Sequence, residues 1–220
     1  MCEYREWADV ESAPTRLLVN SLINQNLPPY SGDRSYNMVY MFLAEGFEEV
    51  EALCPLDLLR RAGVEIKTVG VGGRRIRGSH GIEVTADITA SEARRLLKKQ
   101  APEMVILPGG MPGTLNLQSA KTVNEFIKAA AESDAYLAAI CAAPMILGEL
   151  GLLVGKRAVC YPGFEDRLIG AEIPVKESVV KDGRFITGKG MGVALEFGLT
   201  LVSTLVSKET ADELRSAVQA

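Results

Sequence analysis

From Met38 onward, the sequence alternates short, continuous apolar runs with longer segments of helical composition. Apolar runs of this kind are typical of parallel strands buried on both faces, with helices carrying the chain back across the sheet. The pattern therefore predicts an α/β fold with a doubly wound parallel sheet sandwiched by helices. The expected strands are 38–43, 64–71, 104–109 and 136–140, and the expected helices between them are 48–62, 91–99, 119–132 and 142–150.

The remaining segments are expected to complete the sheet and to precede it. Shorter strands are predicted at 157–162, 178–182 and 183–188, with Asp182-Gly183 marking a hairpin, and helices follow over 193–206 and at the C-terminus. Residues 1–37 show no clear period and end in prolines and a turn cluster. We expect them to be a poorly ordered N-terminal extension, or the product of a start codon assigned too early, ahead of one domain over 38–220.

Composition excludes several classes of function. The chain has 220 residues, a formal net charge of -4 and a single histidine, His80. Zinc sites with two histidines, haem pairs and two-histidine iron sites all need more imidazole than this, so we expect no metal. The mild acidic excess and the absence of a long basic run argue against a nucleic-acid partner.

The chain is expected to be cytoplasmic and not bound to a membrane. No apolar stretch approaches the ~18 residues of a membrane-spanning helix, and the first twenty residues lack the apolar core of a signal peptide. Thiols stay reduced in the cytosol, so each of the four cysteines is either a small buried residue or a reactive thiol.

Cys141 is the strongest candidate for chemistry. It lies where the apolar run 136–140 stops and an alanine-rich helix begins, with small neighbours Ala139, Ala142 and Ala143. This is the layout of a nucleophile elbow, and the helix start is expected to lower the pKa of the thiol. Taken alone, the cysteine is better explained as an inert, buried side chain at a strand end; the two features that follow favour the reactive thiol.

Two further strand ends supply candidate partners. Gly109-Gly110 follows the run 104–108, and the amide of Gly110, with that of Ala142, is a candidate oxyanion hole; an ordinary glycine turn is the alternative. The first strand is followed by acidic residues, of which Glu51 stands four residues before Pro55. A proline there bends the helix and presents Glu51 toward the strand ends, where burial beside the thiol is expected to raise its pKa.

Three motifs at these separations carry a resemblance to a known family. FLAEGFEEVEAL, LPGG and AAICAAP occur in order, and the sequence resembles the ThiJ/PfpI superfamily, most closely the branch of the parkinsonism-associated deglycase (DJ-one) and its bacterial relatives. The likeness runs from about Met38 to the C-terminus. It implies a flavodoxin-like fold, of the class I glutamine amidotransferase-like type, in a homodimer without metal or organic cofactor.

The resemblance also implies site residues and an activity. The nucleophilic, oxidation-sensitive cysteine of the family falls on Cys141, its buried acid on Glu51, and its oxyanion donors on Gly110 and Ala142. The implied activity is a glyoxalase III or deglycase, which converts methylglyoxal or glyoxal to the hydroxy acid without glutathione or removes early glyoxal adducts. The alternative is a redox-sensing, chaperone-like protein in which Cys141 oxidises under stress.

The chain departs from the family at one informative position. Much of this branch has a histidine where this chain has Tyr161, and the sole histidine, His80, lies far upstream and is expected to be on a surface loop. A cysteine-histidine-acid triad therefore requires His80 to reach the site. The peptidase branch has histidine directly after the cysteine, where this chain has Ala142, so proteolysis is disfavoured. Cys160 is expected to be a free, buried thiol.

Overall fold

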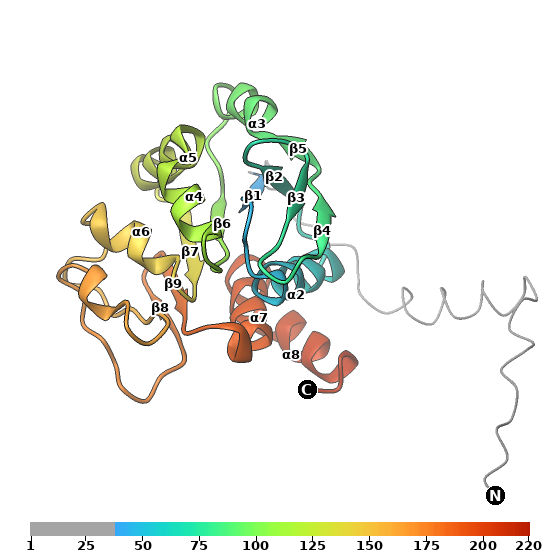
Figure 1. The fold of residues 1–220 in the computed structure, drawn as a ribbon. Helices are drawn as coiled ribbons and strands as arrows, with labels where there is room; N and C mark the ends of the chain where they lie inside the picture. Colours follow the sequence, from blue (N-terminus) through green and yellow to red (C-terminus); the bar gives the residue numbers. More distant parts are fainter. Residues whose placement is uncertain (1–37) are drawn as a thin grey trace, which may run out of the picture. The chain divides into compact units, whose positions relative to one another are not determined.

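The buried apolar runs form a sheet of seven strands in the computed structural model, which describes residues 38–220 (Figure 1). The sequence interpretation of residues 1–37 lies outside this range. Six neighbouring strands are parallel, and the last is antiparallel to its neighbour. The expected doubly wound parallel sheet is confirmed. Across the sheet the order is β5 (Ile88–Thr89), β2 (Ile66–Gly70), β1 (Val39–Leu43), β6 (Met104–Leu107), β7 (Tyr136–Ile140), β9 (Phe185–Gly188) and β8 (Val179–Asp182).

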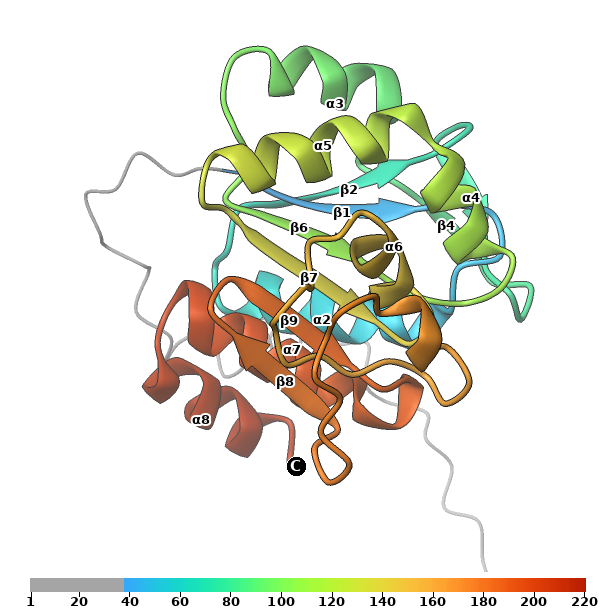
Figure 2. The same cartoon turned by 90° about the vertical axis from the view of Figure 1, so that its left-hand side faces the viewer.

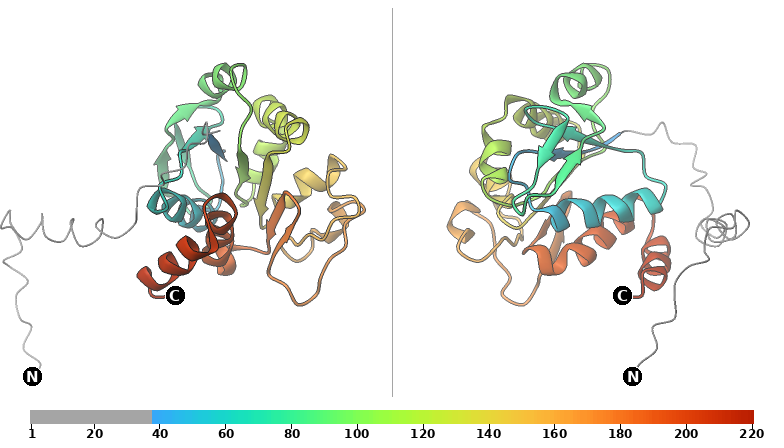
Figure 3. Two further views of the ribbon diagram at one scale, coloured as in Figure 1. Left: turned by 180° about the vertical axis from the view of Figure 1, so that it is seen from behind. Right: turned by 45° about the vertical axis from the view of Figure 1, so that its right-hand side comes forward.

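Helices cover both faces of this sheet (Figure 2). One face carries α3 (Ala90–Leu97), α4 (Gly113–Ser119), α5 (Lys121–Glu132) and α6 (Pro144–Glu149). The other carries α2 (Glu49–Arg61) and α7 (Ala194–Leu205), with α8 (Lys208–Ala217) against α7. Two short 3-10 turns, Glu165–Arg167 and Met191–Val193, and a separate antiparallel pair, β3 (Arg75–Arg77) and β4 (Glu83–Thr85), complete the elements; Figure 3 shows the pair from two further sides.

The central strands are buried on both faces because both layers of helices pack on them. All five residues of β1 are buried. On one face the rings of Tyr40 and Phe42 meet the Phe126 ring of α5 edge to face, with centroids 4.8 and 5.0 Å apart, which is a favourable arrangement for aromatic pairs. This burial explains why the strands appear in the sequence as continuous apolar runs.

One predicted strand is wrong, and one helix was not predicted. The helix expected over 119–132 is confirmed as α5, whereas α4 precedes it and was not expected; Ala120 between them has an extended backbone, which separates the two helices. The strand expected at 157–162 is a loop with one isolated bridge, from Arg157 to Glu172. Instead of pairing with the backbone of a neighbouring strand, the amide of Val159 donates a hydrogen bond to the side-chain hydroxyl of Thr187 at 2.9 Å.

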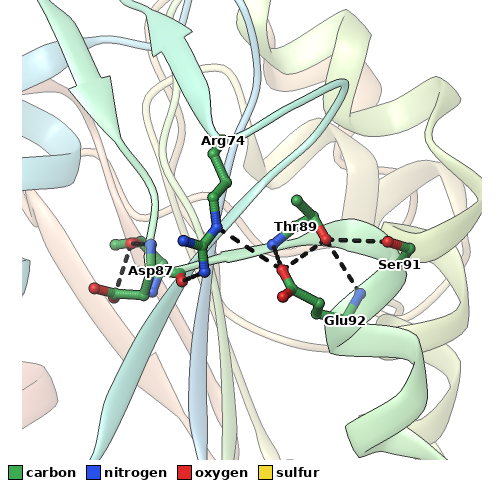
Figure 4. A network of polar contacts seen from close by, with 6 residues as sticks. Arg74, Asp87, Thr89, Ser91 and Glu92 are labelled. Atoms are coloured by element: carbon green, nitrogen blue, oxygen red, sulfur yellow. Dashed lines mark hydrogen bonds and ion pairs between the residues drawn. The ribbon is translucent and has the colours of Figure 1, made fainter.

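Polar contacts secure the short edge strand β5 and the start of α3 (Figure 4). Asp87 accepts hydrogen bonds from the amide and the hydroxyl of Thr68 at 2.8 and 2.9 Å, and Arg74 donates to the backbone carbonyl of Asp87. Thr89 and Glu92 form a capping box at the helix N-terminus. Because these groups satisfy one another, the cluster stabilises the sheet edge and offers no open site.

The order of the strands identifies where a site is expected. The chain passes from β1 to β2 on one side and later returns to β6 on the other, so the direction of winding switches beside β1. Doubly wound sheets bind ligands at the carboxyl ends of the strands at this switch point. Among the helices of residues 38–220, none combines the length and the apolar character needed to cross a bilayer.

Candidate functional site

Cys141 occupies a sharp turn directly after β7. Its φ of 64° lies in the left-handed region, which side chains other than glycine adopt at an energetic cost and which clusters at functional sites. The turn is fixed by two backbone hydrogen bonds: the Cys141 amide donates to Gly188 at 2.9 Å, and its carbonyl accepts from Tyr161 at 2.8 Å. Helix α6 begins only at Pro144, three residues later, so the cysteine stands on the turn and not on the helix.

Glu51 comes from the first turn of α2, on the opposite face of the sheet. Glu48 caps this helix by accepting a hydrogen bond from the Glu51 amide at 2.6 Å. The Glu51 side chain is 1% exposed and accepts hydrogen bonds from the amides of Gly109, at 3.1 Å, and Met191, and from the Cys141 thiol. The helix continues through Pro55 without a break. The carboxyl group of Glu51 lies at the ends of the strands, which is the position that the sequence predicts.

Gly109 is required because the thiol and the carboxyl group both lie against its backbone. A Cβ atom at this position would stand 2.5 Å from the Cys141 Cβ and 2.5 Å from Oε2 of Glu51. No side chain fits in that space. The glycine therefore lets the end of β6 approach both groups and donate its amide to the carboxylate.

Replacing Gly109 by alanine is expected to push Glu51 and Cys141 apart. We expect a loss of ~1–3 kcal/mol in the free energy of unfolding, since forced overpacking typically has this effect. We also expect a faster reaction of Cys141 with iodoacetamide, because the charge and the hydrogen bond of Glu51 raise the pKa of the thiol. Urea unfolding and intact mass after alkylation measure the two. The matched control is Gly73→Ala, because a Cβ at Gly73 would meet no atom within 4 Å; equal effects of both changes would contradict this account.

The environment of the thiol corrects one expectation from the sequence. The amides of Gly110 and Ala142 donate to the sulfur and act to lower its pKa, as a helix start was expected to do. Burial, followed by the charge of Glu51 and its hydrogen bond, outweighs them and raises the pKa of Cys141 to about 12. The predicted acidification is wrong because it left out the burial of the thiol, which together with the Glu51 carboxylate outweighs the two amides.

The same contact sets the state of Glu51. Burial, as the largest cause, and the charge of Glu48 raise the pKa of Glu51 to about 7, against the opposing hydrogen bonds from Cys141, Gly109 and Met191. The expected upward shift is confirmed. Near neutral pH the thiol therefore holds its proton beside a carboxyl group that gains and loses one, which is the arrangement that general acid-base chemistry needs.

His80 belongs to a different cluster. Its ring Nδ1 lies 2.9 Å from the buried Glu49 carboxylate, and its amide donates to the same group at 2.8 Å, while its side chain is 71% exposed. The hydrogen bond and charge of Glu49 raise the pKa of His80. The expected surface position is confirmed. Glu48, Glu49 and His80 have ligand atoms within 4.8 Å of one another, but both carboxylates already accept protein hydrogen bonds.

Cys160 and Tyr161 are near the candidate site, but their side chains take no part in the contact between the Cys141 thiol and the Glu51 carboxyl group. Cys160 is a free, buried thiol, as expected, in the apolar core on the α5 side of the sheet, and burial, then Glu165, raises its pKa to about 12. Tyr161 stands where the family histidine was expected, with an exposed ring. No sequence pattern indicates that the Tyr161 amide binds the Cys141 carbonyl or that the Met191 amide binds Glu51.

The fold and this geometry define a class: a flavodoxin-like, doubly wound α/β protein with a cysteine on a strand-to-helix turn, in contact with a buried carboxyl group. Comparison with known proteins agrees. Residues 37–204 match the DJ-1/PfpI family, and the chain belongs to this family. The family resemblance and the flavodoxin-like fold inferred from the sequence are therefore confirmed.

Several relatives are similar over most of the described chain. A Parkinson disease protein 7 homolog of Danio rerio is 34% identical over 180 residues, 80% of this chain and 93% of the relative. A glutathione-independent glyoxalase of Caenorhabditis elegans is 30% identical, over 77% of this chain and 89% of the relative. The chain spans less than half of two Arabidopsis thaliana relatives, DJ-1 homologs B and A, at 41% and 44% of their lengths with 35% and 36% identity.

Solved structures give the same result. A DJ-1 superfamily protein of Salmonella typhimurium, a cysteine-to-alanine mutant, is 32% identical with a TM-score of 0.77, covering 83% of this chain and 98% of that chain. A Toxoplasma gondii DJ-1 described as oxidized is 30% identical with a TM-score of 0.77, covering 83% of this chain and 98% of that chain.

Proposed function

We propose that this protein is a cofactor-independent glyoxalase of the glyoxalase III type, with a deglycase activity on early glyoxal adducts through the same chemistry. The observation that carries the proposal is the contact between the Cys141 thiol and the buried Glu51 carboxyl group, with two backbone amides donating to the sulfur. Family membership and the relative named as a glutathione-independent glyoxalase support it.

In the first step, the sulfur of Cys141 adds to the aldehyde carbon of methylglyoxal. A carbon-sulfur bond forms, and the thiol proton passes to Glu51, which is ionised above about pH 7. The carbonyl oxygen becomes an oxyanion beside the amides of Gly110 and Ala142, which stabilise developing charge without having to reorganise. The oxyanion then takes the proton from Glu51, and the product is a hemithioacetal.

In the second step, Glu51 removes the proton from the former aldehyde carbon and returns it to the neighbouring carbon through an enediol. The aldehyde carbon is thereby oxidised and the ketone carbon reduced, so no external electron carrier is needed. The resulting thioester is hydrolysed by water to lactate, or to glycolate when the substrate is glyoxal, and Cys141 regains its proton. One nucleophile and one acid-base group suffice for the cycle.

Lactate formation from methylglyoxal, without glutathione and as a function of pH, tests this proposal. Because Glu51 must be ionised to accept the thiol proton, kcat/KM is expected to rise about tenfold per pH unit below an apparent pKa near 7 and to level above it. In Glu51→Gln this dependence is expected to disappear. A full-length protein that forms no lactate at any pH would refute the proposal, and a rate that falls as pH rises through 7 would refute the role of Glu51.

A redox-responsive function is the second candidate. The partly exposed Cys141 has two amide donors at its sulfur and a carboxyl group that holds a proton near neutral pH, and these groups would stabilise a sulfinate. A related Toxoplasma gondii DJ-1 has been solved as oxidized. Formation of a two-oxygen adduct on Cys141 at low peroxide, in protein without glyoxalase activity, would favour this function over the first.

The proposal also includes a cytosolic homodimer that needs no metal or organic cofactor. Family membership supports the assembly, and the low histidine count supports the absence of a two-histidine metal centre.

A further inference from the structure

Tyr161 is a half-exposed aromatic residue close to the candidate site. Its backbone amide is tied to the carbonyl of Cys141 at 2.8 Å, so the residue is fixed beside the nucleophile. Its ring packs on the backbone of Gly190, where a Cβ atom would lie 3.3 Å from Cδ2 of Tyr161 and 3.8 Å from Oε1 of Glu51. The aromatic ring and the carboxyl group of Glu51 therefore both lie close to the position that a side chain at residue 190 would occupy.

A second apolar side chain flanks this place. Met191 follows Gly190, and its amide donates to Glu51, so the segment that positions the carboxyl group also carries the methionine. Tyr161 is 51% exposed and Met191 is 54% exposed. Large apolar side chains usually lose much of their exposure on folding. These two exposed residues lie on the segments whose backbone amides bind the Cys141 carbonyl and the Glu51 carboxyl group, and we refer to Tyr161 and Met191 together as the apolar rim.

Charge near the site selects against anionic ligands. Glu48 acts on Glu51 by like-charge repulsion, and a substrate carboxylate or phosphate would add a further negative charge to this region. Uncharged ligands with an apolar group avoid that repulsion and gain contact with the rim. A flexible, polarisable methionine beside an aromatic ring suits a flat apolar substituent.

We propose that Tyr161 is a specificity-determining residue whose ring, with Met191, contacts the substituent on the ketone carbon of the substrate. This inference rests on the proposed function and narrows it to neutral 2-oxoaldehydes with an apolar or aromatic substituent, such as phenylglyoxal, in preference to glyoxal. The expected size of the preference follows from hydrophobic pockets in general, where one apolar contact changes the ratio of kcat/KM values for two substrates by ~10-fold or more.

Alkylation of Cys141 tests the rim without requiring turnover. Full-length protein is treated at pH 8 with iodoacetamide or with its N-benzyl analogue, and the rate at Cys141 is followed by peptide mass. We expect the ratio of benzyl to parent rates to fall ~5-fold or more in Tyr161→Ala, by loss of one apolar contact, and to be kept in Tyr161→Phe. The ratio cancels any change in the thiolate fraction. An unchanged ratio in Tyr161→Ala would overturn the proposal.

Turnover tests the substrate class. Wild type is expected to show a higher kcat/KM for phenylglyoxal than for glyoxal. Tyr161→Ala is expected to lower this preference ~10-fold through KM, and Tyr161→Phe is expected to keep it. Equal preferences in wild type and Tyr161→Ala would overturn the assigned specificity. If wild type consumes neither aldehyde, both the proposed function and the proposed substrate class are refuted. The ratio of alkylation rates still decides, independently of turnover, whether Tyr161 contacts an apolar group bound at Cys141.

Discussion

Replacing Cys141 by serine is expected to lower the rate of lactate formation from methylglyoxal by ~10³-fold or more, as removal of a covalent nucleophile typically does. The serine hydroxyl is far less acidic than a thiol, and Glu51, with a pKa of about 7, is too weak a base to ionise it. The backbone of the turn is unchanged by this substitution. Lactate is measured over several hours with the variant and wild type side by side.

Cys54→Ser is the matched control for this substitution. Cys54 is a free, partly exposed thiol on the same helix as Glu51, and we expect its variant to keep the wild-type rate within about twofold because it takes no part in covalent catalysis. Urea unfolding confirms that the Cys141 variant is folded. Lactate formation by folded Cys141→Ser at the wild-type rate would show that another group is the nucleophile.

Replacing Glu51 by glutamine is expected to make the protein more stable at pH 8 and less active. The pKa of Glu51 is about 7 in the folded protein, against an ordinary value of 4.5. Between these values the folded chain binds more protons than the unfolded chain, so the stability contributed by protonated Glu51 is present below pH 4.5 and is lost as pH rises through 7. At about 1.4 kcal/mol for each tenfold change in proton affinity, ionisation costs about 3 kcal/mol.

Glutamine removes this cost, so the free energy of unfolding of Glu51→Gln should exceed that of wild type by about 2–3 kcal/mol at pH 8 and approach it near pH 5. Turnover should fall ~10²–10⁴-fold with the loss of the acid-base group. Urea unfolding at both pH values and the lactate assay measure these effects. A variant that is less stable than wild type at pH 8, by an amount independent of pH, would contradict the ionisation cost.

Glu49→Gln provides the opposite control. Glu49 is also buried, but although burial acts to raise its pKa, hydrogen bonds from His80 and Ile82 outweigh it and hold the pKa below its ordinary value. Its ionised form is therefore stabilised by the fold. Glutamine at 49 should destabilise the protein at pH 8, so two substitutions of the same kind, two residues apart on one helix, are expected to act with opposite signs.

The sequence allowed the central sheet to be predicted because burial on both faces leaves a continuous apolar run for each strand. It failed at 157–162, where a similarly apolar segment is buried as a loop. There Val159 bonds to the Thr187 side chain and Tyr161 to the Cys141 carbonyl. Apolar pattern reports burial and not hydrogen-bond partners, so it could not distinguish this loop from a strand.

The sequence allowed the residues of the candidate site to be predicted, but not the direction of the pKa shift at Cys141. Strand-end reasoning brought Cys141, Glu51 and Gly110 to one edge, and the structure places them in contact. The direction of the thiol pKa shift depends first on burial and then on the charge and hydrogen bond of Glu51, and it was predicted with the wrong sign. The pairing of Glu49 with His80 joins residues 31 apart in sequence, and no local pattern signals it.

The first turn of α2 carries two buried carboxyl groups, Glu49 and Glu51, that contact different parts of the protein. Glu49 ties down the loop from Gly78 to Ile82 through its oxygens, while Glu51 reaches the thiol. Because both carboxylates lie on one helical turn, we expect a change that releases this loop from Glu49 to alter the position of Glu51. The loop would then influence the chemistry at the neighbouring carboxylate although it contributes no atom to the reaction.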